Sequence, residues 1–306
     1  MMNLPYKFRE QVGYCSPKGP DFKRAQTIRF AVEGTAVEFK APRHTVKSTL
    51  VEERRIKGHY SYDRMAFLEG HPDYVVDKSW RVCLLFYRAW LFNGDWFTGP
   101  QSELTMTLGM VMQAVPEPEN AFFGSPTATP PAPPGRPAVS FFHPRAFEQA
   151  VGDYLTHKYS KPRSHGRPKW MAPLNWKPLN SLPCVCAYLE VESSNHDNSA
   201  RTRHKYIFFP VDDTHLMYLR FIPSRLFLND TPAELDKLVD AKPMDDLMQQ
   251  IINSFSLTLS PAAQAQQKKA LEGLDNTALI EQFLPMKWST AEEDAEWEAW
   301  KKLYNL

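Results

Sequence analysis

A proline-rich segment near the middle of the chain constrains the fold more than any other feature of the sequence. Residues 116–137 read PEPENAFFGSPTATPPAPPGRP and hold eight prolines in twenty-two positions. Proline fixes φ and lacks a backbone N–H, so this segment cannot run through the interior of a helix or a sheet. We therefore expect a semi-rigid connector or a long surface loop. It divides the chain into a mainly β lobe, 1–115, and an α+β lobe, 138–306.

The composition supports folded cores and gives no global indication of a charged partner. Hydrophobic residues make up 43% of the chain, which is ample for a core, and the formal net charge of +1 offers no overall attraction to nucleic acids or membranes. No secretory signal is visible, the longest apolar run is too short to span a membrane, and four cysteines do not make a disulfide scaffold. We expect a cytoplasmic protein with reduced thiols and no cofactor.

The first lobe reads as mainly β. Residues 27–40 contain two alternating runs separated by a Glu-Gly pair, which is a hairpin signal. Residues 80–92 and 103–115 form a second predicted pair of strands, with Gly-containing breakers between them. The charged segment 45–70 is ambiguous, and we expect helix there if any regular structure forms.

The second lobe mixes helices with strands. Apolar periodicity and helix start signals predict five helices, at 143–158, 243–255, 261–273, about 276–284 and 290–304. Alternating runs predict strands at 184–192, 205–222 and 256–259, and the second of these folds back at Asp212-Asp213. This order predicts an α+β fold with two lobes, in which antiparallel sheets are covered by helices.

Cys184-Val185-Cys186 raises the question of a metal site, with His196 and His204 downstream. Structural zinc sites usually separate their cysteines by two to four residues, and here the gap is one. In a strand, residues two apart face the same side, so both thiols would enter the core. We favour buried thiols and expect no metal site.

No constellation for catalysis stands out in the sequence. The nine histidines lack the spacings HxxH and HExxH, and no cysteine lies in a nucleophile elbow or at the start of a helix. Asp212-Asp213-Thr214 could supply paired carboxylates, but aspartate is also favoured in tight turns, where it bonds to the local backbone. We interpret these residues as a hairpin turn that is exposed enough to contact a partner. An enzyme site assembled from residues distant in sequence is an alternative.

A basic, aromatic stretch is the strongest candidate for binding. No acidic residue occurs from Tyr154 to Leu189, and Trp170 and Trp176 are interleaved with cations. The cations are Lys158, Lys161, Arg163, Arg167, Lys169 and Lys177. Such a composition suits a protein interface, single-stranded nucleic acid, or a solvated loop whose tryptophans cover the core. Nucleic-acid binding through 158–177 is therefore our second hypothesis.

The order of features in the second half resembles a known family. The strand pair YIFFPVDDTHLMYLRF is followed by a charged connection, an amphipathic helix ending in IINSF, and the strand SLTL. This order resembles the PsbP-like fold, and variants of that fold occur among TsiT-type immunity proteins of bacterial type VI secretion systems. In the first half, FKAP, YRAW and PQSELTM are similar to sheet segments of such immunity proteins.

The resemblance implies a cytoplasmic, non-catalytic inhibitor that binds a cognate effector toxin, with a nuclease as the implied target. The expected contact residues come from the basic stretch and the hairpin turn, not from the resemblance. They are Arg163, Arg167, Trp170, Trp176, Asp212 and Asp213.

Overall fold

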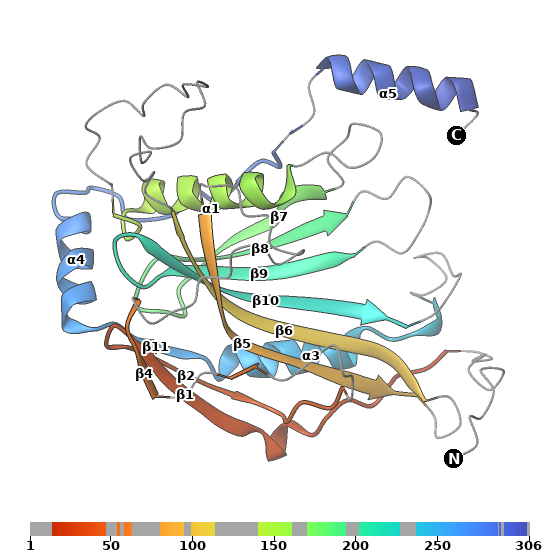
Figure 1. Cartoon of the computed structure of the whole chain (residues 1–306), viewed down its shortest axis with the longest axis horizontal. Coiled ribbons are helices and arrows are strands. Elements are labelled where there is room, and N and C mark those ends of the chain that lie inside the picture. The colour runs from red at the N-terminus through yellow and green to blue at the C-terminus, as the bar shows by residue number, and fades with distance from the viewer. Residues whose placement is uncertain are drawn as a thin grey trace, which may run out of the picture.

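Two β-sheets and four α-helices make up the described part of the fold in the computed structural model (Figure 1). The structure describes residues 14–46, 54–55, 58–62, 80–94, 99–113, 140–160, 170–193, 202–226, 237–286, 288 and 291–304. The proline-rich segment 116–137 lies outside the described residues, so the expected connector stays a prediction.

The larger sheet has seven strands in the order β3-β5-β6-β10-β9-β8-β7, and its neighbours are all antiparallel. The strands are β3 (Arg54–Arg55), β5 (Trp80–Asn93), β6 (Pro100–Gln113), β7 (Trp170–Leu179), β8 (Cys186–Ser193), β9 (Arg203–Pro210) and β10 (His215–Arg225). The predicted strand pairs at 80–115 and 205–222 are confirmed as β5–β6 and β9–β10. The strand expected at 184–192 is confirmed as β8.

The smaller sheet has four strands in the order β11-β2-β1-β4. They are β1 (Gln26–Val32), β2 (Thr35–Ala41), β4 (Gly58–Tyr60) and β11 (Ser256–Thr258). The predicted hairpin is confirmed as β1–β2, and Glu33 (φ 46°) and Gly34 (φ 79°) both adopt the left-handed conformation that a tight hairpin turn requires. β4 lies parallel to β1, whereas β11 is antiparallel to β2.

Each sheet takes strands from both sides of the proline-rich segment, which differs from the expected assignment of one sheet to each half of the chain. β6 precedes the segment and pairs along eleven positions with β10, which follows it. β11, from the end of the chain, pairs with β2 in the small sheet. The α+β class with two sheet lobes is confirmed, but the boundary at 116–137 does not coincide with the boundary between the sheets.

Four of the five predicted helices are confirmed. They are α1 (Pro144–Tyr159), α3 (Lys242–Asn253), α4 (Pro261–Leu271) and α5 (Ala291–Tyr304). The ends follow helix-capping rules: the His143 side chain accepts a hydrogen bond from the backbone N–H of Arg145, and Ser260 accepts one from Ala263. Proline occupies the first turn of each of these two helices, where its missing N–H costs nothing.

The helix expected at about 276–284 is wrong, because this segment is an extended strap. The backbone N–H of Ile280 donates to the Glu148 carboxylate at 2.6 Å, and the N–H of Met286 donates to the carbonyl of Ala172 at 2.8 Å. Leu279 and Phe283 pack with α1 and β7. Tertiary contacts therefore satisfy the backbone groups that a helix would have used locally.

Strands also form in two segments where the sequence predicted helix or irregular structure. Residues 54–55 and 58–60, within the segment read as helical at best, are β3 and β4. Residues 170–179, within the stretch read as proline-broken, form β7 at the edge of the large sheet. In β7, proline is tolerated because edge strands do not need every N–H for pairing.

The large sheet lies between two hydrophobic cores (Figure 1). On one face, α1 and the strap, which continues to Met286, cover the sheet, and Phe147, Val151 and Leu155 of the helix are fully buried. On the other face lie the small sheet and α3, which contributes Met244, Leu247, Met248 and Ile251. The small sheet consequently has one buried face and one face toward solvent.

A buried arginine joins the two sheets. The side chain of Arg88, on β5, is 1% exposed, and its guanidinium donates to the carbonyls of Ala41 and Pro42 at 3.0 and 2.6 Å. A second nitrogen donates to the Gln26 side chain at 2.9 Å, and the cation lies 5.2 Å from the Phe86 ring centroid. One planar donor fork thus reaches the start of β1 and the end of β2 from the large sheet.

Replacing Arg88 by methionine should lower the free energy of unfolding by about 3 kcal/mol, because buried acceptors lose their charged donor. Arg88→Lys should recover only part of the loss, since an ammonium lacks the fork geometry. Urea denaturation measures both, with Arg29→Met as the control, because Arg29 is 72% exposed. A loss in Arg88→Met no larger than in the control would contradict the clamp.

A fragment comprising residues 138–306 should not unfold cooperatively, because it lacks the eleven-position partner of β10. Adding a separately produced 1–115 fragment should restore a cooperative thermal transition in circular dichroism. A sharp transition in the 138–306 fragment alone would show that this half folds independently of β6.

Candidate functional site

The structure places the expected contact residues at separate positions. Arg163 and Arg167 lie outside the described residues. Trp170 lies at the start of β7, near the first residues of β9, whereas Asp212 and Asp213 follow the last residue of β9. At about 3.3 Å per residue, the two ends of this strand lie roughly 23 Å apart. The basic stretch and the hairpin turn therefore do not form one compact site.

Trp170 belongs to an aromatic cluster around Lys158. The ammonium of Lys158 lies 5.5–5.8 Å from the ring centroids of four tyrosines, Tyr154, Tyr159, Tyr206 and Tyr218. The Trp170 ring lies 5.1 Å from Tyr159. Burial, reinforced by neighbouring tyrosines, raises the pKa of Tyr154 and of Tyr159 far above the usual range, so both phenols stay neutral. The cluster therefore joins Lys158 and Tyr159, which precede residues 161–169, to Trp170, which follows them.

Trp176 serves the core in this structure. Its side chain is 9% exposed, its indole N–H donates to the carbonyl of Ile280 at 2.8 Å, and its ring packs 5.1 Å from Phe283. This matches the alternative in which a tryptophan of the basic stretch covers the core. A partner contact through Trp176 stays a prediction, and the buried ring does not favour it.

Asp212 forms the centre of a clasp between the sheets, while residues 211–214 form the expected turn. Its carboxylate accepts hydrogen bonds from the Tyr62 hydroxyl, the backbone N–H of Thr214 and the backbone N–H of His215. The Tyr62 ring stacks on the His215 ring with centroids 3.9 Å apart. Burial opposes ionisation of Asp212, but the bonds from His215 and Tyr62 outweigh it and hold the pKa of this carboxyl below its usual range.

Asp213 contributes through its backbone. Its carbonyl accepts a hydrogen bond from the N–H of Phe141 at 2.9 Å, which ties the turn to the segment before α1. The interpretation of Asp212-Asp213 as a hairpin turn is therefore confirmed, whereas their contact with a partner stays a prediction.

The cysteine pair lies in the core, as expected. Cys184 and Cys186 are both buried, and they belong to the same hydrophobic cluster between the sheets. Burial raises the pKa of the Cys186 thiol to about 12 and raises that of Cys184 as well, so neither is a ready thiolate.

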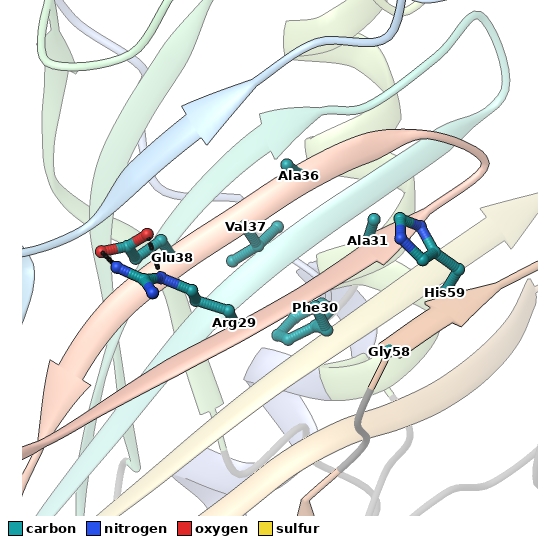
Figure 2. A pocket seen from close by; sticks show the side chains of 8 residues that line it. All are labelled: Arg29, Phe30, Ala31, Ala36, Val37, Glu38, Gly58 and His59. Atoms are coloured by element: carbon teal, nitrogen blue, oxygen red, sulfur yellow. Dashed lines mark hydrogen bonds and ion pairs between the residues drawn. The ribbon is translucent and has the colours of Figure 1, made fainter.

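A hollow of about 280 Å³ lies on the outer face of the small sheet (Figure 2). Ala31 of β1 pairs with Ala36 of β2 and with His59 of β4, so one row across three strands carries two alanines and an exposed histidine. Arg29 and Glu38 form the neighbouring pair of the hairpin. The hollow exists because the two alanines leave space between longer side chains.

The rim of the hollow carries opposite charges. The guanidinium of Arg29 donates to both carboxylate oxygens of Glu38, at 2.6 and 3.1 Å, and Figure 2 shows this pair at one end with His59 at the other. The hydrogen bond raises the pKa of Arg29 and lowers that of Glu38, so both remain charged across the physiological range. An apolar floor with a charged rim is the arrangement found at protein interfaces.

The hollow is small for a metabolite site. Small-molecule pockets usually measure about 300–1,000 Å³ and enclose most of the ligand. A floor of alanine side chains can instead accept one projecting side chain of another protein, whose neighbours would meet Arg29, Glu38 and His59. Sequence reasoning missed this site, although strict alternation in TIRFAVEGTAVEFK assigns Arg29, Ala31, Ala36 and Glu38 to one face.

Comparisons with known proteins give little further guidance. No protein-family model matches the chain, and no curated protein matches it significantly. A solved structure with some likeness is the apo structure of immunity protein TplEi of the type VI secretion system from Pseudomonas aeruginosa. It is 10% identical, with 82% of this chain and 80% of that chain covered, at a TM-score of 0.24. A likeness at this level carries no argument about fold or function.

Among the described residues, no helix combines the length and apolar character needed to cross a membrane. Among these described residues, no group of three or more histidine, cysteine or acidic side chains is placed to hold a metal ion.

The clasp predicts a specific pH dependence. Because the folded pKa of Asp212 lies below its unfolded value of about 3.9, its contribution is complete above that value and is lost as the pH falls through the folded pKa. Asp212→Asn should cost about 2 kcal/mol at neutral pH. Urea unfolding curves should show this difference shrinking toward pH 3. In Asp213→Asn, whose side chain takes no part in these bonds, the cost at neutral pH should be smaller.

Proposed function

We propose that the protein is an immunity protein that neutralises a cognate type VI secretion effector in the cytoplasm by stoichiometric binding. The alanine-floored hollow on the small sheet carries this proposal, because its shape and rim suit a protein side chain. The resemblance in strand and helix order to TsiT-type immunity proteins supports the class of partner and suggests a nuclease effector. In this proposal the protein blocks its target and catalyses no reaction.

The surrounding structure makes the hollow a rigid contact. The inner side chains of the hairpin, Ile28, Val37 and Phe39, are at most 1% exposed and belong to the core. The Arg88 clamp holds the open end of the hairpin, at the paired residues Gln26 and Ala41, against the large sheet. A rigid surface loses little conformational entropy on binding, which favours a tight inhibitor. Arg163 and Arg167 remain proposed as additional contacts.

The test begins with recovery of the tagged full-length protein from its native cells and identification of co-eluting proteins by mass spectrometry. The proposal expects a near-stoichiometric partner that is toxic when expressed alone and harmless when co-expressed with this chain. A recovered chain without such a partner, or a partner that is not toxic, would overturn it.

A substitution that fills the hollow should show whether this surface, and not another one, binds the partner. Ala36 is exposed on the outer face, so Ala36→Trp should leave thermal stability nearly unchanged and weaken binding of the recovered partner by about tenfold or more. Isothermal titration calorimetry measures the affinity. Ala265→Trp, at an exposed position of α4, is the matched control and should bind normally. Equal affinities for both variants would remove the hollow from the proposed interface.

A further inference from the structure

The strap, residues 276–286, covers one side of a core although most of it faces solvent. It runs from α4 toward α5 along α1 and β7 (Figure 1). Seven of its eleven residues are exposed, and Leu279 is its one buried residue. The half-buried residues are Ile280, Phe283 and Met286. The strap therefore buries little apolar surface for its length.

Two side chains hold the backbone of the strap at a single residue. The N–H of Ile280 donates to the Glu148 carboxylate of α1 at 2.6 Å, and its carbonyl accepts from the Trp176 indole N–H of β7 at 2.8 Å. Glu148 also accepts hydrogen bonds from the Arg145 guanidinium at 2.8 and 2.7 Å. Its carboxylate therefore keeps a cationic partner whether or not the strap is in place, which lowers the cost of releasing Ile280.

The remaining contacts of the strap also lie on α1 and β7. The N–H of Met286 donates to the carbonyl of Ala172 at 2.8 Å, and the Phe283 ring lies 5.1 Å from the Trp176 ring. Phe283 approaches the backbone of α1 at Gly152, where a Cβ atom would lie 3.3 Å from the ring. Breaking these contacts leaves the strand pairing within both sheets intact.

The flanks of the strap are held independently of its contacts with β7. Before it, Gly273 has a φ of 74°, which glycine adopts without strain, and the N–H of Ala278 bonds to the nearby Asn276 side chain. After it, the Trp288 indole N–H donates to the Thr156 hydroxyl of α1 at 3.2 Å. The strap is thus a segment between two tethers, and it can leave β7 without release of either end.

We propose that the strap is a releasable cover over the surface that α1 and β7 form, and that it opens as one unit while both sheets stay folded. Segments with few buried side chains and exposed backbone open at a lower free energy than the core strands. In the open state this surface presents the Glu148 carboxylate and the Trp176 indole N–H. Both groups bond to backbone in the closed state, so the chemistry exposed on opening suits an extended polypeptide.

Hydrogen exchange of the full-length protein, followed by NMR, tests this inference. The reporters of the strap are the amides of Ile280 and Met286 and the indole N–H of Trp176. All three should share one protection factor, because one opening exposes them together. This factor should be about a hundredfold or more below those of the Phe208 and Tyr218 amides, in the paired central strands β9 and β10.

A pair of phenylalanine variants separates local from global opening. Phe283→Ala should raise exchange at the three strap reporters together by about tenfold or more and leave the β9 and β10 amides unchanged, because its packing on Trp176 stabilises only the closed strap. Phe255→Ala is the matched control, since Phe255 is also half-buried but packs on Phe39 and Phe209 in the other core. It should leave the strap reporters unchanged.

Equal protection of the strap and of the central strands would overturn the proposal, because the strap would then open only with the whole protein. Faster exchange of the strap reporters in Phe255→Ala would overturn it for the same reason. Unequal protection among the three reporters would rule out a single opening unit. If Phe283→Ala does not fold, the wild-type protein and Phe255→Ala still decide between these outcomes. The assay uses the purified chain alone, so its result is independent of whether an effector binds at the hollow.

Discussion

A buried guanidinium between two sheets is the interaction on which the arrangement of this protein depends. Hydrophobic contacts hold the layers together, but they are not directional and do not by themselves select one orientation. Arg88 supplies the direction, because a cation that is 1% exposed must have its N–H groups satisfied, and its acceptors lie at the start of β1 and the end of β2. The Tyr62–Asp212 clasp makes a second polar connection, from the segment after β4 to the β9–β10 turn.

The β1–β2 hairpin serves the core and the surface through a single alternating pattern. Side chains such as Ile28 and Phe39 enter the core, while Arg29, Ala31, Ala36 and Glu38 face outward. Because the two sets of side chains alternate along the same strands, the packing of the inward side chains also fixes the positions of the outward side chains. A binding surface built in this way is as rigid as the core beneath it, which suits an inhibitor that must hold one target tightly.

Local patterns in the sequence predicted most elements, and long-range contacts account for the failures. Alternation and capping residues identified the β1–β2 hairpin, α1, α3 and α4, because their signals lie within a few residues. The strap at 276–284 was misread because its backbone bonds to Glu148 and Ala172, more than a hundred residues away. Trp176 is held in the core by a similarly distant contact, since its indole N–H donates to the carbonyl of Ile280, more than a hundred residues away. The alternation in the hairpin assigns most of the residues around the hollow to one face. His59, however, comes from β4, and no local pattern in the sequence predicts that β4 pairs in parallel with β1.

The position of β11 has a consequence for synthesis of the chain on the ribosome. The hairpin β1–β2 is made first, yet β2 keeps an open edge until residues 256–258 emerge and pair with it. In the large sheet, one edge of β6 likewise stays unpaired until β10 has been made. Contacts of such sequence separation slow folding, so the nascent chain must keep these edges apart from other chains until residues 256–258 have been made.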